Sequence, residues 1–254
     1  MRWFRFVEMI AVFSVALGLC NDMNIHARIG QKDSSNQGTF IDLRDGKTYH
    51  WVKIGKQIWM AENLNYGRQH LTHPREKDPS FREKGFLLDG EKYCYAEDSQ
   101  NCNRYGGLYT FYVAVNACPE GWRLPSYEDW VELEGVASST SYPLDAETKK
   151  DTIKGEWILG VSPKYDQLGF YARPAGYRRW KPYPSDMYKP SAQAFYDYQG
   201  TQTLWWTSTI THNIDYGVYS VEPWCVNLGL SSSDHLSASR CIPVDGYSIR
   251  CVKE

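Results

Sequence analysis

The sequence predicts an α+β domain with short helices early, antiparallel strands late, and disulfide bonds that hold it together. Short runs of aromatic and β-branched residues, separated by Gly, Ser, Asn and Asp, are typical of strands. The 254 residues include seven cysteines, 10 Trp and 19 Tyr. Such an aromatic content favours core and cross-strand packing in a β-rich domain. The alternative is an aromatic surface that stacks on sugars.

The first expected element is a hairpin. Residues 49–54 and 57–60 are short apolar runs on either side of Gly55-Lys56, a pair suited to a tight turn. Asp45-Gly46 predicts an earlier turn, and ordered structure is expected from about Phe40. Residues 68–92 are charged and rich in helix breakers, which predicts a long loop.

The helices are expected in the middle of the chain. Residues 109–117 favour a short helix that ends before Pro119-Glu-Gly121. Ser126 and Asp129 have the spacing of a capping box, in which each side chain accepts from the other residue's backbone N–H. Trp130, Leu133 and Ala137 follow at helical spacing and predict one buried stripe. A weaker helix is expected over 145–154.

Strands dominate the rest of the chain. Four strand-like runs are separated by turn-forming residues, over 170–177, 203–209, 224–228 and 247–252. There is no internal repeat and no heptad pattern. The order of elements therefore predicts an α+β fold.

Charge excludes one class of partner. The net charge is −2, from 28 Lys and Arg against 30 Asp and Glu. Nucleic-acid binding normally requires a clustered basic surface, and an acidic membrane surface attracts basic segments. We therefore expect no nucleic-acid partner and no direct membrane binding by the folded domain.

The N-terminus predicts export. Arg2 and Arg5 precede an apolar run over 9–19 that is too short to span a bilayer, which favours a signal peptide. Leu17-Gly-Leu-Cys20 resembles a bacterial lipobox, so Cys20 is the expected lipidation site. The alternative is cleavage after Gly18 without lipid. Residues 21–39 are polar and predict a tether.

Cysteine parity agrees with lipidation. With Cys20 lipidated, six cysteines remain, an even number suited to three disulfides in an oxidising compartment. Zinc is the competing explanation, but the chain has no C-x2-C pair. Fifteen connectivities are possible, and spacing alone does not choose among them.

Several blocks resemble one family in both residues and order. They are Asp45–Leu64, which contains K-I-G-K-Q-I-W-M-A-E-N-L; Gly107–Ser126, which contains C-P-E-G-W-R-L-P-S; and the segments over 168–178, 205–209 and 247–253. Together they are similar to the Fibrobacter succinogenes major paralogous domain, over roughly residues 40–254. Residues 66–93 and 179–193 are insertions relative to the family's usual spacing.

The resemblance implies location more than chemistry. Members of the family are typically exported envelope or surface proteins, often lipoproteins, with no established activity. The segment 122–130, a distant aromatic strand and a final R-C-V are also similar to the C-type-lectin-like fold, which formylglycine-generating enzymes broadly share. Function does not follow from that fold.

The lectin-like resemblance also implies a disulfide pattern. In such folds a bridge joins a helical segment to the last strand, which corresponds to Cys118 and Cys251 here. Cys94 and Cys102 are near neighbours that can meet locally across a polar turn. The remaining pair, Cys225 and Cys241, would close a Ser-rich loop over 231–239.

No catalytic machinery is recognisable. The chain lacks G-x-S-x-G, and its acidic residues neither support nor exclude glycoside hydrolysis. Glu222-Pro-Trp224 with Asn227 faintly resembles a lectin calcium signature, but a strand entry stiffened by Pro223 is the favoured explanation. We expect no metal, no cofactor and no enzyme activity, with a glycan-active enzyme as the alternative.

A stiff aromatic loop is the expected recognition surface. In segment 179–193 and just before it, aromatic and basic side chains alternate, and three prolines restrict the backbone. The expected ligand-binding residues are Trp180, Tyr183, Tyr188 and Arg178. The alternative is a loop that folds its aromatic rings onto the domain. The sequence thus predicts an envelope or surface protein that is adhesive or carbohydrate-binding, or a structural envelope component.

Overall fold

The computed structural model of the 254-residue chain describes residues 36–71, 87, 89–139, 157, 168–181, 193–215, 218–229 and 235–254. Residues 37–254 form one compact unit. The expected signal segment, nearly all of the tether and the helix expected over 145–154 lie outside the described residues.

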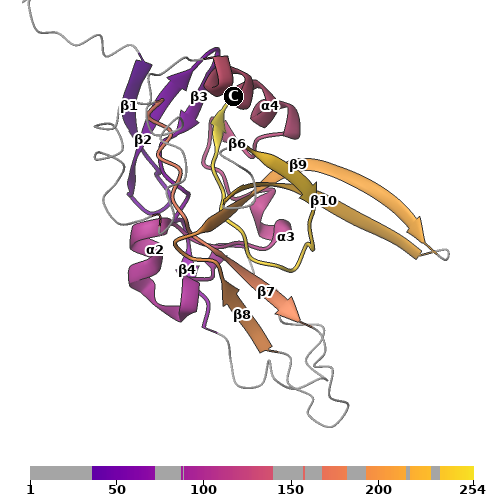
Figure 1. Cartoon of the computed structure of the whole chain (residues 1–254). Coiled ribbons are helices and arrows are strands. Elements are labelled where there is room, and N and C mark those ends of the chain that lie inside the picture. Colours follow the sequence, from indigo (N-terminus) through magenta and orange to yellow (C-terminus); the bar gives the residue numbers. More distant parts are fainter. Residues whose placement is uncertain are drawn as a thin grey trace, which may run out of the picture. The chain divides into compact units, whose positions relative to one another are not determined.

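Antiparallel strands dominate this unit, as predicted. A five-stranded sheet has the order β1-β2-β3-β12-β6, and a three-stranded sheet has the order β11-β10-β9. The strands of these sheets are β1 (Gln37–Ile41), β2 (Thr48–Ile54), β3 (Gln57–Met60), β6 (Trp122–Arg123), β9 (Gln202–Asp215), β10 (Val218–Gly229), β11 (Ser237–Arg240) and β12 (Val252–Lys253) (Figure 1).

Two strand pairs and four short helices complete the described structure. The pairs are β4 (Arg68–Gln69) with β5 (Glu91–Lys92), which is parallel, and β7 (Tyr177–Lys181) with β8 (Gln193–Asp197), which is antiparallel. The helices are η4 (Tyr95–Glu97), α2 (Ser99–Tyr105), α3 (Phe111–Ala114) and α4 (Tyr127–Ser139). None of the described helices is both long and apolar enough to cross a membrane.

The predicted hairpin is confirmed. Strands β2 and β3 pair antiparallel around Gly55, whose φ of 59° lies in the left-handed region that glycine adopts easily. The C-terminal strand β12 then pairs with β3 on one side and with β6 on the other. Residues near the end of the chain therefore lie beside the β2–β3 hairpin.

The main helix is also confirmed. The Ser126 hydroxyl accepts from the Asp129 N–H (3.3 Å), and the Asp129 carboxylate accepts from the Ser126 N–H (2.7 Å). This reciprocal pair starts α4 where the capping-box spacing predicts. Trp130, Leu133 and Ala137 are buried along one stripe of the helix.

The alternation of strand side chains divides the core into two clusters. Trp59 and Trp205 pack with Trp130 and Phe170 in one cluster, whereas Met60 and Trp206 belong to the other. Neighbouring residues on a strand point to opposite faces, so β3 and β9 are covered on both sides at these positions. Because Trp59, Trp130, Trp205 and Trp206 are fully buried, much of the aromatic content serves the core, as the favoured explanation predicts.

Other details of the sequence prediction differ. The first three strands precede every described helix, so helices do not come first. Residues 68–69 and 91–92, expected within a long loop, form the parallel pair. The run 170–177 contributes only Tyr177 to a strand. Helix α2 was not foreseen, because its sequence S-Q-N-C-N-R-Y carries no apolar stripe.

Three disulfide bonds join distant and local parts of the unit. The structure links Cys94 to Cys102, Cys118 to Cys251 and Cys225 to Cys241, with Cα–Cα separations of 5.1, 5.9 and 5.9 Å. These are the three pairs expected from the sequence and the lectin-like resemblance. The bridge from Cys118 fixes the end of the chain beside Trp122 and β6.

Candidate functional site

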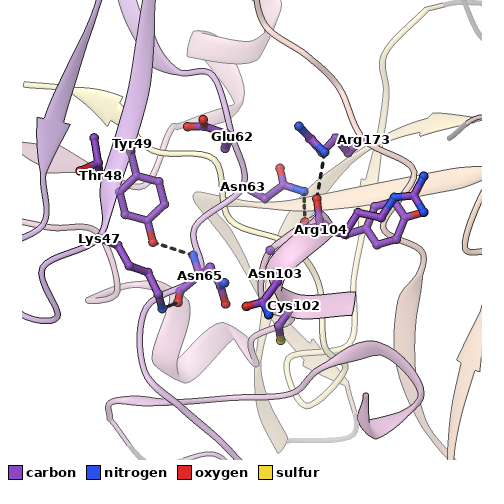
Figure 2. A pocket seen from close by; sticks show the side chains of 12 residues that line it. Lys47, Thr48, Tyr49, Glu62, Asn63, Asn65, Cys102, Asn103, Arg104 and Arg173 are labelled. Atoms are coloured by element: carbon purple, nitrogen blue, oxygen red, sulfur yellow. Dashed lines mark hydrogen bonds between the residues drawn. The ribbon is translucent and has the colours of Figure 1, made fainter. Parts of the chain in front are cut away.

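A polar pocket of about 300 Å³ lies where three distant segments meet. One wall consists of residues at the start of β2 and in the segment after β3. The end of α2 forms another wall, and the Arg173 side chain completes the lining. Figure 2 shows Lys47 and Tyr49 at one side of the pocket and Arg104 and Arg173 at the other. The volume is at the small end for ligand sites and suits one sugar-sized group.

Asn63 fixes the inner wall through a fully satisfied network. Its Oδ1 accepts from Arg250 Nε (3.0 Å), from Arg250 Nη2 (2.8 Å) and from Trp205 Nε1 (2.9 Å). Its Nδ2 donates to the Tyr105 carbonyl at 2.8 Å. Arg250 is fully buried and donates further to backbone carbonyls of Met60, Phe170 and Tyr171. A buried guanidinium with this many acceptors holds its neighbours in fixed positions.

Helix α2 forms the opposite wall and is fixed at both ends. Asp98 caps its N-terminus by accepting from the Gln100 N–H at 2.9 Å, and Cys102 is bonded to Cys94. Gly106 ends the helix with φ +86°. A Cβ at this position would approach the Asn63 Cβ to 2.5 Å, so only glycine allows the helix end to lie against the wall.

Asn65 differs from Asn63 in one respect: its side-chain oxygen has no partner. The Asn65 N–H donates to the Tyr49 hydroxyl (3.0 Å), and its backbone carbonyl accepts from Lys92 Nζ (2.7 Å) and from Lys47 Nζ. The Oδ1 atom is buried and accepts no hydrogen bond from any residue that the structure describes. A buried acceptor without a donor is costly, and in a native structure it calls for an explanation such as an ordered water, an ion or a bound group.

The charges around Asn65 are unevenly balanced. Lys47 also pairs with Asp45 (3.0 Å), whereas Lys92 is 6% exposed and has the Asn65 carbonyl as its hydrogen-bond acceptor. Burial, with a smaller contribution from the nearby Lys47 ammonium, lowers the pKa of Lys92 to about 8. Burial likewise raises the pKa of Tyr49, so its hydroxyl stays protonated as a hydrogen-bonding group.

Glu62 is the carboxylate at the pocket rim. It accepts from the His50 backbone N–H (2.8 Å) and contacts the His50 ring. These contacts hold Glu62 against the outer face of β2. Apart from Glu62, the charged side chains that line the pocket are the cations Lys47, Arg104 and Arg173.

Of the expected ligand-binding residues, the two that the structure describes, Arg178 and Trp180, do not line this pocket. The expectation for Arg178 requires correction: its side chain is fully buried, and its guanidinium lies 3.8 Å above the centre of the Tyr93 ring. Stacking on an aromatic face replaces solvent around the cation. Trp180 is half-buried on β7, and its backbone N–H donates to the Asp245 carboxylate (2.7 Å). Tyr183 and Tyr188 lie outside the described residues.

The residues of the faint calcium signature have other partners. Glu222 pairs with Arg240 (2.8 Å), and the Asn227 side-chain oxygen accepts from Gln202 (2.7 Å). Pro223 lies within β10 at a register shift, so it belongs to a strand interior and not to a strand entry. Among the described residues, no three His, Cys, Asp or Glu side chains come together as a metal site would require.

Sequence reasoning missed the pocket because its walls are far apart in the chain. One signal was present: Glu62-Asn-Leu-Asn65 places three polar side chains directly after strand β3. Polar side chains directly after a strand often line sites, since loops on a rigid scaffold carry function. The pairing of this segment with α2 and Arg173 is visible only in the folded structure.

These features define a disulfide-bonded, mostly antiparallel β domain with a preformed polar pocket. The family model of the Fibrobacter succinogenes major domain matches residues 52–253, and the chain belongs to that family. This confirms the resemblance seen in the sequence. No curated protein and no solved structure matched the chain.

Proposed function

We propose that this protein is an exported, non-catalytic protein of the bacterial cell envelope that binds a glycan in the pocket beside Asn65. The observation that carries the proposal is the polar pocket that Asn65 lines, together with the Asn65 Oδ1 atom that lacks a donor among the described residues. A sugar hydroxyl is a suitable donor for this oxygen. Sites that hold their polar groups in place before binding lose little entropy when the ligand enters.

The location in the envelope rests on the sequence and the disulfides. A positively charged start, an apolar run and Cys20 favour export with lipid attachment at Cys20. Three disulfides suit an oxidising compartment, since such bonds are rare in the cytosol. The lectin-like arrangement of the fold belongs to the same proposal, on the strength of the segment over 122–130.

Binding is tested on a glycan array with the full-length chain, in calcium and in chelator. The matched variants are Asn65→Ala, which removes the orphan acceptor, and Asn116→Ala, an asparagine outside the pocket lining. We expect wild type and Asn116→Ala to bind the same glycans, and Asn65→Ala to bind none of them. Equal binding by all three proteins would contradict the proposal.

The same array separates a binder from an enzyme. Mass spectrometry of the spotted glycans after incubation should show intact chains. Shortened glycans would establish the glycan-active enzyme instead. Loss of binding after Trp180→Ala, with Asn65→Ala unaffected, would place recognition in the aromatic segment over 179–193.

Lipid attachment is tested separately. Mass spectrometry of the protein expressed in a bacterium with its own lipoprotein pathway should show a mature N-terminus at Cys20 carrying acyl chains. A mature chain beginning at Leu19 without lipid would contradict this part of the proposal.

A further inference from the structure

The distal part of the β9–β10 pair forms a two-stranded arm, made of residues 210–215 and 218–223. Among the described strands, these two segments pair only with each other, because β11 pairs with β10 over 224–227 alone. Figure 1 shows the arm extending away from the other strands of the domain. A two-stranded ribbon is marginally stable by itself in water, and each open edge can accept a further strand. The arm is therefore a candidate interaction surface.

The edge of β9 that faces away from β10, its outer edge, is occupied near the domain and open on the arm. The N–H groups of Trp206 and Ser208 donate outward, to carbonyls of two other segments at 3.1 and 2.8 Å. Alternate residues of a strand direct their N–H and C=O groups to the same edge, so Ile210 and His212 also point outward. Neither Ile210 nor His212 has a backbone partner on this edge among the residues that the structure describes.

The outer edge of β9 lacks the features that keep open edges unpaired. Natural edge strands are commonly protected by proline, by charged side chains or by bulges. Residues 202–214 contain no proline and no Asp, Glu, Lys or Arg. The strand on the other edge of the arm, β10, carries Glu222, Pro223 and a register shift beside that proline. The β9 edge is therefore the edge that suits pairing.

One face of the arm also exposes apolar side chains. Ile210 lies opposite Pro223, and the next pair on the same face is His212 with Val221. Ile210 and Val221 are 40% and 43% exposed. A further strand along β9 would extend this row of cross-strand pairs and cover part of its apolar surface.

We propose that the outer edge of β9 pairs antiparallel with the same edge of a second copy of this chain, around a two-fold axis. A second copy fits because the strand carries no carboxylate, ammonium or guanidinium that would repel its own copy, and none that would attract a charged partner. With the axis at Thr211, this residue lies opposite its counterpart. Ile210 then exchanges backbone hydrogen bonds with His212 of the second copy. The dimer is independent of glycan binding.

Proline variants test which edge is used, by sedimentation velocity of the full-length chain over a range of concentrations. Wild type should sediment as a dimer. His212→Pro removes an outward N–H without removing a bond to β10. It should raise the dimer dissociation constant at least about 30-fold, because two symmetry-related hydrogen bonds are lost.

Two control variants accompany His212→Pro. Val221→Pro changes the residue opposite His212, whose N–H points to the other edge of the arm, so the dimer should persist. His212→Ala keeps the backbone N–H and should also remain dimeric. Dissociation of Val221→Pro together with His212→Pro would show that the β9 edge is not the contact.

Cross-linking tests the register. In an antiparallel pair without direct hydrogen bonds, opposite Cα atoms lie about 4.5 Å apart, within disulfide range. Thr211→Cys should therefore link two chains under oxidised glutathione, whereas Ser220→Cys, on β10 of the same arm, should not. A monomeric wild type, or Thr211→Cys that stays unlinked, would overturn the proposal. A monomer would leave the edge to a partner of another sequence.

Discussion

Two asparagines, separated by one residue, have opposite roles in this domain. The Asn63 side chain uses both of its polar atoms: the oxygen accepts from Arg250 and Trp205, and the nitrogen donates to the Tyr105 carbonyl. Asn65 has a buried side-chain oxygen with no donor, next to two converging ammonium groups. The comparison teaches that a satisfied buried polar group holds a wall in place, whereas an unsatisfied one at a pocket is available to a ligand.

Removing the Cys118–Cys251 bridge, which holds the Asn63–Arg250 network in place, should lower the free energy of unfolding more than any other change. Cys118→Ser with Cys251→Ser frees the segment that carries Arg250, and the closed loop spans 133 residues. Chain entropy predicts a loss of about 5 kcal/mol in the free energy of unfolding, against about 2.5 kcal/mol for Cys94→Ser with Cys102→Ser, whose loop spans 8 residues. Urea unfolding of both double variants measures the difference. Equal losses would show that loop length does not govern these bridges.

Removing the Asn63 side chain should break the network from within. Asn63→Ala leaves the Arg250 guanidinium and the Trp205 indole N–H without their shared acceptor. We expect a loss of about 3–5 kcal/mol, since a buried charge stripped of a partner is strongly destabilising. Urea unfolding of the purified variant gives the value. A loss below about 1 kcal/mol would mean that Asn63 does not hold the wall.

The buried Lys92 should make stability depend on pH. Its pKa is lowered in the folded protein, to about 8, so between pH 8 and its ordinary value the unfolded chain binds more protons. The free energy of unfolding should therefore rise as pH increases, by about 1–2 kcal/mol between pH 7.5 and 9.5. The charged groups that face Lys92 are Lys47 and Asp45.

Two variants isolate this contribution. Lys92→Met should flatten the rise in stability, and Lys53→Met, an exposed control, should retain it. Urea unfolding at several pH values supplies the curves. A rise of equal size in all three proteins would assign the pH dependence to other groups.

Disrupting the partly exposed pair of Ser126 and Asp129 should lower the free energy of unfolding the least. Ser126→Ala removes one half of the capping box of α4, and the Asp129 carboxylate keeps its contacts to Arg123 (2.6 and 2.9 Å). The expected loss is about 1 kcal/mol. Thermal unfolding, compared with Ser138→Ala near the exposed end of the same helix, measures it. A loss as large as that of Asn63→Ala would remove the distinction between buried networks and surface pairs.

Local patterns were sufficient for part of the fold. The β2–β3 hairpin and the start of α4 depend on turn and capping residues adjacent in the chain, so the sequence predicts them correctly. Helix α2 depends on the Asp98 cap and the Cys94–Cys102 bond more than on an apolar stripe, and periodicity therefore missed it.

Long-range contacts account for what the sequence could not predict. Arg178 belongs to a charged, aromatic stretch that looks solvent-exposed, yet the Tyr93 ring, 85 positions earlier in the chain, packs against its guanidinium and buries it. The candidate pocket depends on the meeting of residues near 47–65, 102–106 and 173. No local pattern encodes that meeting, and Asn63 and Asn65 look equivalent until their partners are known.

The most direct test of the account is the shift of the thermal unfolding midpoint of Asn65→Ala when a glycan that wild type binds on the array is added. Wild type should gain stability with a binding sugar, because the ligand binds only the folded state. Asn65→Ala should begin at a midpoint equal to or above that of wild type, since it removes a buried acceptor that lacks a donor, and should show no shift. A variant that starts well below wild type, or that shifts as wild type does, would contradict the claim that Asn65 serves binding and not folding.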